Sequence, residues 1–141
     1  MKKMTPEETR AFLLEDGRTG KLATVLADGS PHVVPVWFLL DGDDLIFTTW
    51  HAAQKAANLE REPRVALCVD DERPPFAFVL VQGTVEIDKS AKNLKDWTTR
   101  IAGRYMGEDQ AQAFGKRNAV PGEWLVRLKP EKIVAQKEIA A

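Results

Sequence analysis

The sequence is short of the residues on which several kinds of site are built. Among 141 residues there are one cysteine, Cys68, and two histidines, His32 and His51. A disulfide within the chain is impossible, and Cys68 stands in the apolar run VALCV, where a small buried residue is expected. The histidines fall on different predicted elements without an HExxH or CxxC pattern, so the sequence predicts no metal site.

Long apolar runs and an excess of one charge are also absent. No run approaches the roughly 20 apolar residues that span a bilayer, and the first residues, MKKMTPEETR, lead into charge and not into the apolar core of a signal peptide. The 20 basic and 21 acidic residues give a formal net charge of -1, whereas nucleic-acid-binding proteins usually carry a basic excess. We therefore expect a cytoplasmic protein that binds neither membranes nor nucleic acid.

Three common functional motifs are missing as well. There is no G-x-S-x-G elbow, no G-x-x-x-x-G-K-[ST] loop and no G-x-G-x-x-G turn, and neither histidine is placed with a serine or cysteine nucleophile. The usual sequence reasons for proposing a triad hydrolase, a P-loop protein or a Rossmann protein are therefore absent. No catalytic residue can be named from the sequence.

The first part of the chain predicts a helix followed by three strands. Thr5 and Glu8 form a capping-box pattern, so a short helix should run to about Glu15. The β-prone runs KLATVLA and PHVVPVWFLL flank Asp28 and Gly29, a pair favoured in two-residue hairpin turns. After the turn-rich DGDD, the run LIFTT predicts a third strand.

The rest of the chain predicts strands separated by helices. A helix should end by Glu62, followed by the strands RVALCVD and FAFVLVQGTVEID, with Gly83 marking a bulge or a close backbone approach. Helices are predicted over 90–106 and about 108–116, and the chain should close with two strands around Pro130. We expect one mainly β domain over 1–141, a closed or nearly closed antiparallel barrel of six or seven strands with peripheral helices; a sandwich is the alternative.

The stretch Leu45–Arg64 holds the best candidate site. Here a strand that ends in Thr48 and Thr49 leads into a helix on which Lys55 and Asn58 share a face. Hydroxyls before a helix start and a lysine in its first turns suit an anion, because the N–H groups there are unsatisfied. The alternative is an ordinary surface helix with a solvated lysine.

A flat ligand could lie along the preceding strand. Pro35 cannot donate to a sheet ladder, so it belongs at an edge or bulge where the backbone is open to a ligand; an edge proline that prevents aggregation explains it equally well. Trp37 or Trp50 could line a planar cofactor, or could belong to the core.

Several separated segments together resemble a known family. The hairpin ADGSPHVVPVWF, the block FTTxxxxxxKxxNLxxxPRVAL from Phe47 to Leu67 and the strand VQGTVEI resemble the pyridoxamine 5′-phosphate oxidase-like split-barrel flavoproteins. More narrowly they resemble the branch that uses the deazaflavin coenzyme F420, group B of the flavin/deazaflavin oxidoreductases. The resemblance is strong from about Gly20 to Ile87 and looser to Val134.

This resemblance implies a homodimer with two cofactor sites at the subunit interface. By it, Lys55 binds the cofactor phosphate. The other residues that it places near the cofactor are Thr48, Thr49 and Asn58 around the phosphate, Pro35, Val36 and Trp37 along the ring system or ribityl chain, and Phe76 as a nearby aromatic.

Two departures argue against vitamin B6 oxidase activity. Enzymes that make pyridoxal phosphate have an arginine immediately before the lysine of the block, where this chain has Gln54. Their longer C-terminal segment is only abbreviated here, in WLVRLKPE. The acidic tail of the deazaflavin would instead suit further bases, for which Arg61 and Arg64 are candidates.

The expected function is transfer of a hydride from reduced F420 to an electron-poor small organic substrate. The alternatives are an FMN-dependent reductase or oxidase of the same fold, and a non-enzymatic protein that binds or stores a flavin or haem, with His32 or His51 on the iron. The substrate pocket is expected to involve the loop 71–75 and residues of the other subunit, with Arg104 or Tyr105 as candidates.

Overall fold

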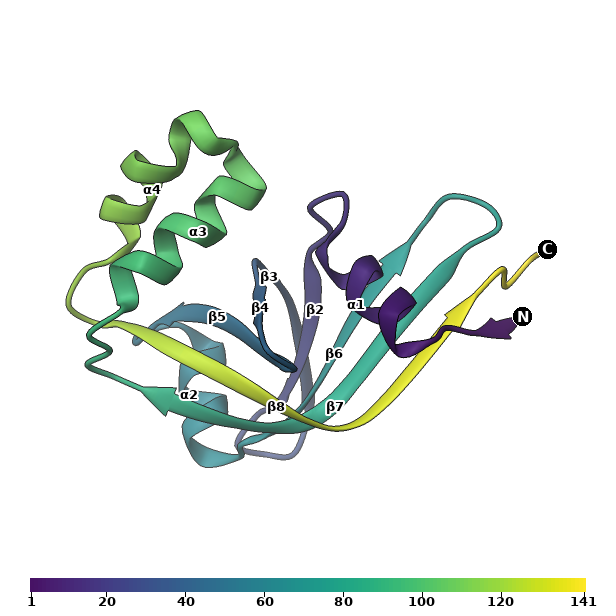
Figure 1. Ribbon diagram of the computed structural model, residues 1–141. Helices are drawn as coiled ribbons and strands as arrows, with labels where there is room; N and C mark the ends of the chain where they lie inside the picture. The colour runs from purple at the N-terminus through teal and green to yellow at the C-terminus, as the bar shows by residue number, and fades with distance from the viewer.

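One antiparallel sheet of eight strands forms the centre of the protein (Figure 1). The computed structural model describes residues 1–141. The strands are β1 (Lys2–Lys3), β2 (Gly20–Val25), β3 (Pro31–Val36), β4 (Leu39–Asp41), β5 (Asp44–Trp50), β6 (Arg64–Asp71), β7 (Ala77–Asp88) and β8 (Glu123–Lys137). The helices are α1 (Pro6–Leu14), α2 (Gln54–Arg61), α3 (Leu94–Met106), the 3-10 turn η1 (Glu108–Gln110) and α4 (Ala111–Asn118).

The sheet curls round without closing by hydrogen bonds. Its strand order is β3-β2-β6-β7-β8-β5-β4, with β1 paired to the end of β8. The two end strands, β3 and β4, are consecutive in the chain and are joined by Trp37 and Phe38. The mainly β, nearly closed architecture is therefore confirmed, and a single sheet excludes the sandwich.

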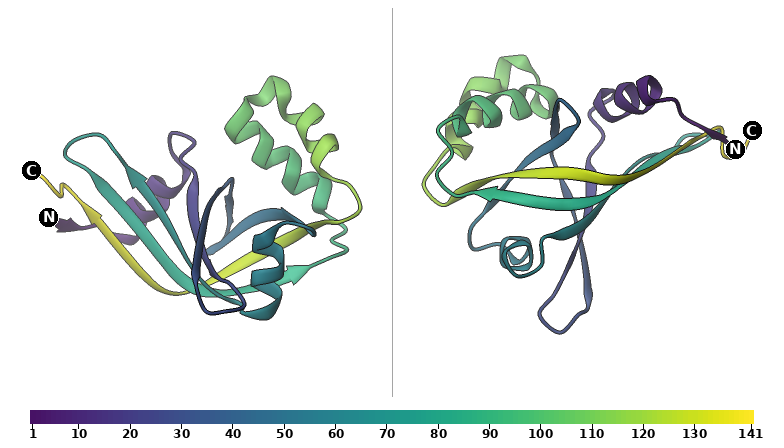
Figure 2. Two further views of the ribbon diagram at one scale, coloured as in Figure 1. Left: turned by 180° about the vertical axis from the view of Figure 1, so that it is seen from behind. Right: turned by 60° about the horizontal axis from the view of Figure 1, so that its bottom comes forward.

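The helices lie around the sheet and not within it. Figure 2 shows α1 and the α3–α4 pair at opposite ends of one side, with α2 on the other side. The capping box predicted for α1 is present, since the Thr5 N–H donates to Glu8 at 3.0 Å and the Glu8 N–H donates to the Thr5 hydroxyl at 3.1 Å. None of the helices combines the length and the apolar character needed to cross a membrane.

Three local predictions need correction. The β2–β3 loop has one residue more than the expected two-residue turn, because the Leu26 N–H donates to the Ser30 carbonyl and Gly29 takes a φ of 89° between them. The run PHVVPVWFLL is not one strand, because it is broken at Trp37 into β3 and β4. The two strands predicted around Pro130 are one continuous strand, β8.

The irregularity predicted at Gly83 is confirmed. The pairing of β7 with β8 shifts register between Gln82 and Gly83, opposite Pro130. A Cβ atom at Gly83 would lie 2.1 Å from the carbonyl oxygen of Lys129. Only glycine fits this approach, and the shift lets β8 continue past its proline.

Apolar side chains of strands β2 to β8, of the β3–β4 junction and of α1 and α2 form the main core. The members of this core that are fully buried include Leu22, Phe38, Phe47, Leu59, Leu67, Val81 and Leu128. A second, smaller cluster of Ile46, Trp97 and Leu125 fixes α3 to the outer face of β5 and β8. This smaller cluster holds the first half of α3 against the sheet.

Candidate cofactor site

A pocket of about 230 Å³ lies where the end of β3, β5, α2 and the α3–α4 pair meet. Its lining residues are Pro35, Val36, Trp37, Thr48, Lys55, Thr98, Ile101 and Asn118. The fold thus brings together five of the eight residues that the sequence suggested for cofactor binding. The other three lie elsewhere.

The cation in this pocket has no close partner of opposite charge. Lys55 is half-buried in the first turn of α2 and forms no ion pair within 4.0 Å. Burial lowers the pKa of Lys55 below its usual value, because the charged ammonium loses hydration, while the more distant Glu123 opposes this shift. A half-buried cation without a counter-ion favours binding of an anion.

Glu123 is the acidic group that faces Lys55, and no motif in the sequence identifies it. It begins β8 and pairs with Trp50, which places it near the end of β5. Burial raises the pKa of the Glu123 carboxyl, and the Thr48 hydroxyl and the Lys55 ammonium partly offset that rise. The pairing of β5 with β8, two segments far apart in the chain, creates this neighbourhood.

Trp37 is held in place by a residue of α3. Its indole stacks on the ring of Tyr105, with ring centroids 5.1 Å apart and an interplanar angle of 8°. The Tyr105 hydroxyl donates to the Arg18 carbonyl at 2.9 Å and accepts from the Phe38 N–H at 3.2 Å. The wall of the pocket at Trp37 is therefore fixed before any ligand binds.

Arg104 fixes the same junction from its other side. Its guanidinium donates to the carbonyls of Phe38 and Leu13, each at 2.7 Å. Neither Arg104 nor Tyr105 lines the pocket. Both were suggested for a substrate pocket, and in this chain they tie α3 to the β3–β4 junction.

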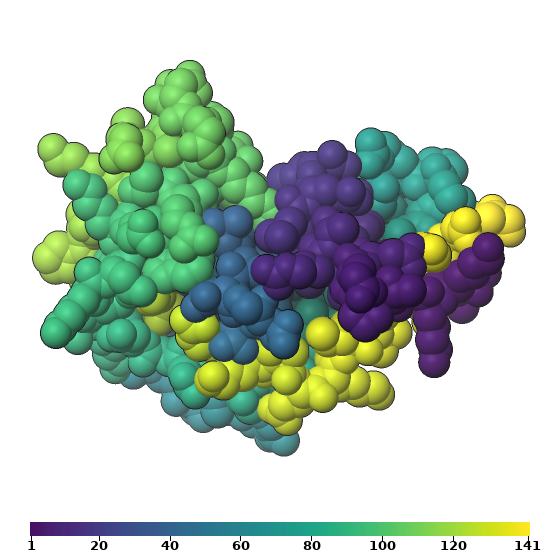
Figure 3. Space-filling view, viewed as in Figure 1, coloured from purple at the N-terminus to yellow at the C-terminus, as the bar shows by residue number.

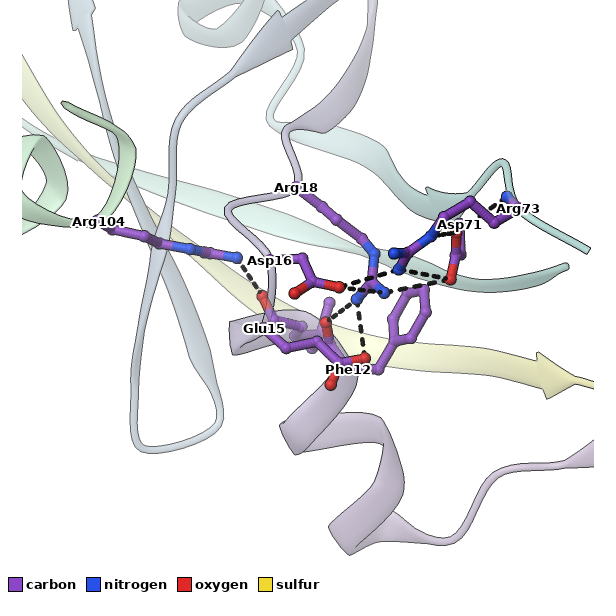
Figure 4. Close-up of polar contacts among 8 residues, drawn as sticks. Phe12, Glu15, Asp16, Arg18, Asp71, Arg73 and Arg104 are labelled. Atoms are coloured by element: carbon purple, nitrogen blue, oxygen red, sulfur yellow. Dashed lines mark hydrogen bonds and ion pairs between the residues drawn. The ribbon is translucent and has the colours of Figure 1, made fainter. Parts of the chain in front are cut away.

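The loop 71–75, also suggested for the substrate pocket, is tied to the end of α1. Figure 4 shows the guanidinium of Arg18 among Glu15, Asp16 and Asp71, with Arg73 bridging the last two from outside. Hydrogen bonds from Arg73 lower the pKa of the Asp71 carboxyl to about 2. The loop thus belongs to a polar cluster separate from the pocket at Lys55.

Thr49 and Asn58 point away from the pocket. The Thr49 side chain is buried on the face of β5 opposite to Thr48, where it donates to the Trp50 carbonyl at 3.4 Å. The Asn58 amide is fully buried, donates to the Thr24 hydroxyl at 3.0 Å and accepts from Gln54 at 2.9 Å. Asn58 thereby fastens α2 to β2.

Phe76 lies at the far end of the molecule from Lys55. It follows the loop 71–75, has a φ of 65° and is 39% exposed beside the residues of α1. The two arginines offered for the cofactor tail already have partners: Arg61 donates to the Val25 carbonyl, and Arg64 pairs with Glu62. Within one chain, therefore, the pocket at Lys55 is not lined by Phe76, Arg61 or Arg64.

The wall formed by α3 and α4 could not be predicted from the sequence. The Thr98 hydroxyl donates to the Gly115 carbonyl at 2.8 Å, and a Cβ on Gly115 would lie 2.1 Å from the Thr99 hydroxyl. This close helix contact positions Thr98 and Asn118 over the pocket. Helical periodicity predicted a helix over 90–106 but not the helix that packs against it.

Comparison with known proteins agrees with this architecture. The family model for pyridoxamine 5′-phosphate oxidase matches residues 5–137. The chain belongs to the pyridoxamine 5′-phosphate oxidase family. No curated protein matches the sequence.

Solved structures of this fold include several kinds of protein. A conserved hypothetical protein from Mycobacterium tuberculosis is 25% identical with a TM-score of 0.84, over 98% of this chain and 89% of that one. An F420 reductase is 31% identical with a TM-score of 0.69, over 86% of this chain and 92% of that one. The heme storage protein from Vibrio cholerae, at 19% identity and a TM-score of 0.71, covers 92% of this chain and 94% of its own and shares the fold. The split-barrel prediction is confirmed.

Proposed function

We propose that this protein is an oxidoreductase that binds coenzyme F420 by its phosphate at Lys55 and reduces an electron-poor small organic substrate. The observation that carries the proposal is the half-buried ammonium of Lys55, which has no ion-pair partner and lies in the same pocket as Trp37. The 31% identity with an F420 reductase supports the choice of cofactor.

The residues of the pocket fit such a cofactor. Lys55 would hold the phosphate by charge, and the Thr48 hydroxyl would donate a further hydrogen bond once it turns from Glu123 to the phosphate. Trp37, fixed by Tyr105, would offer the edge or face of its indole to the ring system, while Thr98 and Ile101 would exclude water from above. When bound, a reduced deazaflavin supplies the hydride, and the protein supplies binding and orientation.

A homodimer is the second part of the proposal. The pocket, at about 230 Å³, is smaller than the roughly 300–1,000 Å³ of typical small-molecule sites. A flavin-sized cofactor would therefore extend beyond the walls that one chain provides. A second subunit would complete the site, and the exposed ring of Phe76, remote from the pocket of its own chain, is a candidate for that contribution.

The sharpest test compares the two cofactors on the same protein. Protein freed of ligand is titrated with F420 and with FMN while the tryptophan fluorescence and the cofactor absorbance are followed. We expect F420 to bind more tightly and to quench the fluorescence through Trp37. Tighter binding of FMN would favour an FMN-dependent reductase or oxidase, and no spectral change with either would contradict the proposal.

Turnover separates an enzyme from a storage protein. Reduced F420 is mixed with a quinone as the electron-poor acceptor, and the return of the oxidised deazaflavin absorbance is followed. We expect faster oxidation with the protein than without it. If the protein binds F420 tightly but does not accelerate its oxidation, the protein is a carrier of the cofactor and the proposed oxidoreductase activity is wrong.

A further inference from the structure

One edge of β8 is unpaired over the middle of the strand. Its first edge pairs with β7 along nearly all of its length. Its second edge pairs with β5 over Glu123–Leu128 and with β1 at Gln136–Lys137. No strand covers the second edge from Lys129 to Val134, although strands lie on both sides of this gap.

The direction of the backbone groups in the gap follows from a neighbouring bond. The Ala135 carbonyl accepts from the Met4 N–H at 3.0 Å, on the second edge. In an antiparallel strand, the N–H and C=O of one residue point to the same edge, and alternate residues share that edge. The N–H and C=O of Ile133 therefore point into the gap, beside a side chain that is 46% exposed.

A groove of about 730 Å³ runs beside this edge, between β8, α1 and the β4–β5 turn. Figure 3 shows these three elements, in yellow, purple and dark blue, meeting around the opening. Apolar side chains cover much of its floor, among them Met4, Leu13, Leu40, Leu45, Ile133 and Ala135. The groove thus offers a backbone edge and an apolar surface together.

The rim of the groove carries free positive charge. Three lining cations form no ion pair within 4.0 Å: Lys3, Arg10 and Lys132. Arg10 instead donates to the carbonyl of Gly42 at 2.6 Å. Of the two lining acids, Asp44 is already paired with Arg127 at 3.0 Å, which leaves Asp43. Acidic groups on a ligand would therefore be favoured.

We propose that this groove binds an extended peptide segment of another protein, whose apolar and acidic side chains alternate. The segment would add a strand to the free edge of β8, with its backbone bonded to Ile133. Addition of a strand to an open edge takes its affinity from main-chain hydrogen bonds and its specificity from alternate side chains. Alternation places apolar side chains on the floor and acidic ones toward the rim. The pocket at Lys55 plays no part in this interaction.

Hydrogen exchange tests the open edge directly. In the free protein, the amide of Ile133 should exchange fast, whereas the amides of Lys132 and Val134, which point toward β7, should exchange slowly. The result expected is this alternation, measured by NMR. A slowly exchanging Ile133 amide in the free protein would overturn the proposal, because the edge would already be covered.

Binding is tested with a synthetic library on the full chain. The probes are fluorescent hexapeptides in which Val, Ile, Leu or Phe alternates with Glu or Asp, and fluorescence anisotropy measures their affinity. We expect a subset to bind, to slow exchange at Ile133 and to lose binding at least tenfold when alternate backbone nitrogens are methylated. If no member binds, or methylated peptides bind equally well, the proposal fails.

Variants complete the test. Ile133→Glu and Lys132→Glu should each lower the affinity for the best peptide at least tenfold. Val33→Glu is the matched control, because Val33 is 64% exposed on the edge strand β3, away from the groove, and it should leave the affinity unchanged. Circular dichroism verifies that each variant folds. Sedimentation measures the oligomeric state of Ile133→Glu. If this substitution dissociates a dimer, the groove binds a second copy of the chain and the proposal is wrong.

Discussion

The ring of Trp37 lies parallel to the ring of Tyr105, with the centroids 5.1 Å apart. Trp37 belongs to the β3–β4 junction and Tyr105 to the last turn of α3. The contact therefore joins the wall of the pocket to the helix pair that covers it. Mutations of Tyr105 can separate the stacking on Trp37 from the hydrogen bonds of the Tyr105 hydroxyl.

Tyr105→Phe should keep the stacking and lose the hydroxyl bonds to Arg18 and Phe38. Because this leaves half-buried backbone groups unpaired, we expect a loss of about 1–2 kcal/mol in the free energy of unfolding. Tyr105→Ala should cost more, since stacking adds about 0.5–1.5 kcal/mol beyond burial. Urea denaturation measures both, with the exposed neighbour Met106→Ala as the control. Equal stability of Tyr105→Phe and the parent protein would contradict this role.

Lys55→Ala should weaken cofactor binding and leave the fold intact. A charge-assisted contact is worth about 1.5–3 kcal/mol, so we expect the dissociation constant to rise about tenfold or more. Lys55→Met should behave likewise while raising the stability of the ligand-free protein, because a half-buried cation without a partner is removed. Isothermal titration provides the measurement, and the exposed Lys116→Ala serves as control. An unchanged dissociation constant would make Lys55 an ordinary surface lysine.

Glu123 should make cofactor binding depend on pH. Its pKa is raised by burial, so at low pH the carboxyl is neutral and Lys55 is free to bind the phosphate. As pH rises through this pKa, the carboxylate forms and competes for Lys55. We expect affinity to fall with rising pH, and Glu123→Gln to flatten that fall. The titration of the cofactor's own acidic groups is common to both proteins, so parallel curves would contradict the prediction.

Asp71 should make the stability of the fold depend on pH in the acid range. Its folded pKa of about 2 lies below the ordinary value of 3.8. The charged form is therefore favoured by folding, and its contribution is present above pH 3.8 and lost as pH falls toward 2. Asp71→Asn should flatten the loss of stability across this window in acid titrations followed by circular dichroism. The exposed, unpaired Asp43→Asn should not, and an identical curve for Asp71→Asn would contradict the prediction.

Gly83→Ala should be among the most damaging small substitutions in the chain. Its Cβ would lie 2.1 Å from the Lys129 carbonyl oxygen, which belongs to the backbone and has no room to move aside. We expect a loss of about 3 kcal/mol or more in the free energy of unfolding. The exposed neighbour Gln82→Ala is the control in a urea denaturation. A loss below about 1 kcal/mol would show that the bulge can relax.

Local rules succeeded where the chain itself sets the structure. The capping box at Thr5, the irregularity at Gly83 and the helix predicted over 90–106 depend on near neighbours or on backbone geometry, and each could be predicted. The two-residue turn at Asp28 failed because that pair also suits a longer loop with Gly29 at positive φ. The break at Trp37 could not be predicted, since Arg104 and Tyr105 impose it from another part of the chain.

The candidate site likewise contains residues that could be predicted from the sequence and residues that could not. Thr48 and Lys55 stand close together in sequence, and β5 leads to α2 within a few residues, so their neighbourhood was predictable. Glu123, Thr98 and Asn118 enter through the pairing of β5 with β8 and through the contact of α3 with α4. No spacing in the sequence encodes those contacts. The face of β5 on which the Thr49 side chain lies could likewise not be predicted without the register of β5.

The junction at Trp37 and Phe38 also determines how the two ends of the sheet are held together. The two end strands meet there through the covalent chain and not through a ladder of strand hydrogen bonds. Burial of Phe38 in the core and the contacts of Arg104 and Tyr105 take the place of that ladder. Because Trp37 also lines the pocket at Lys55, the contacts that join the two ends of the sheet also determine the shape of the pocket.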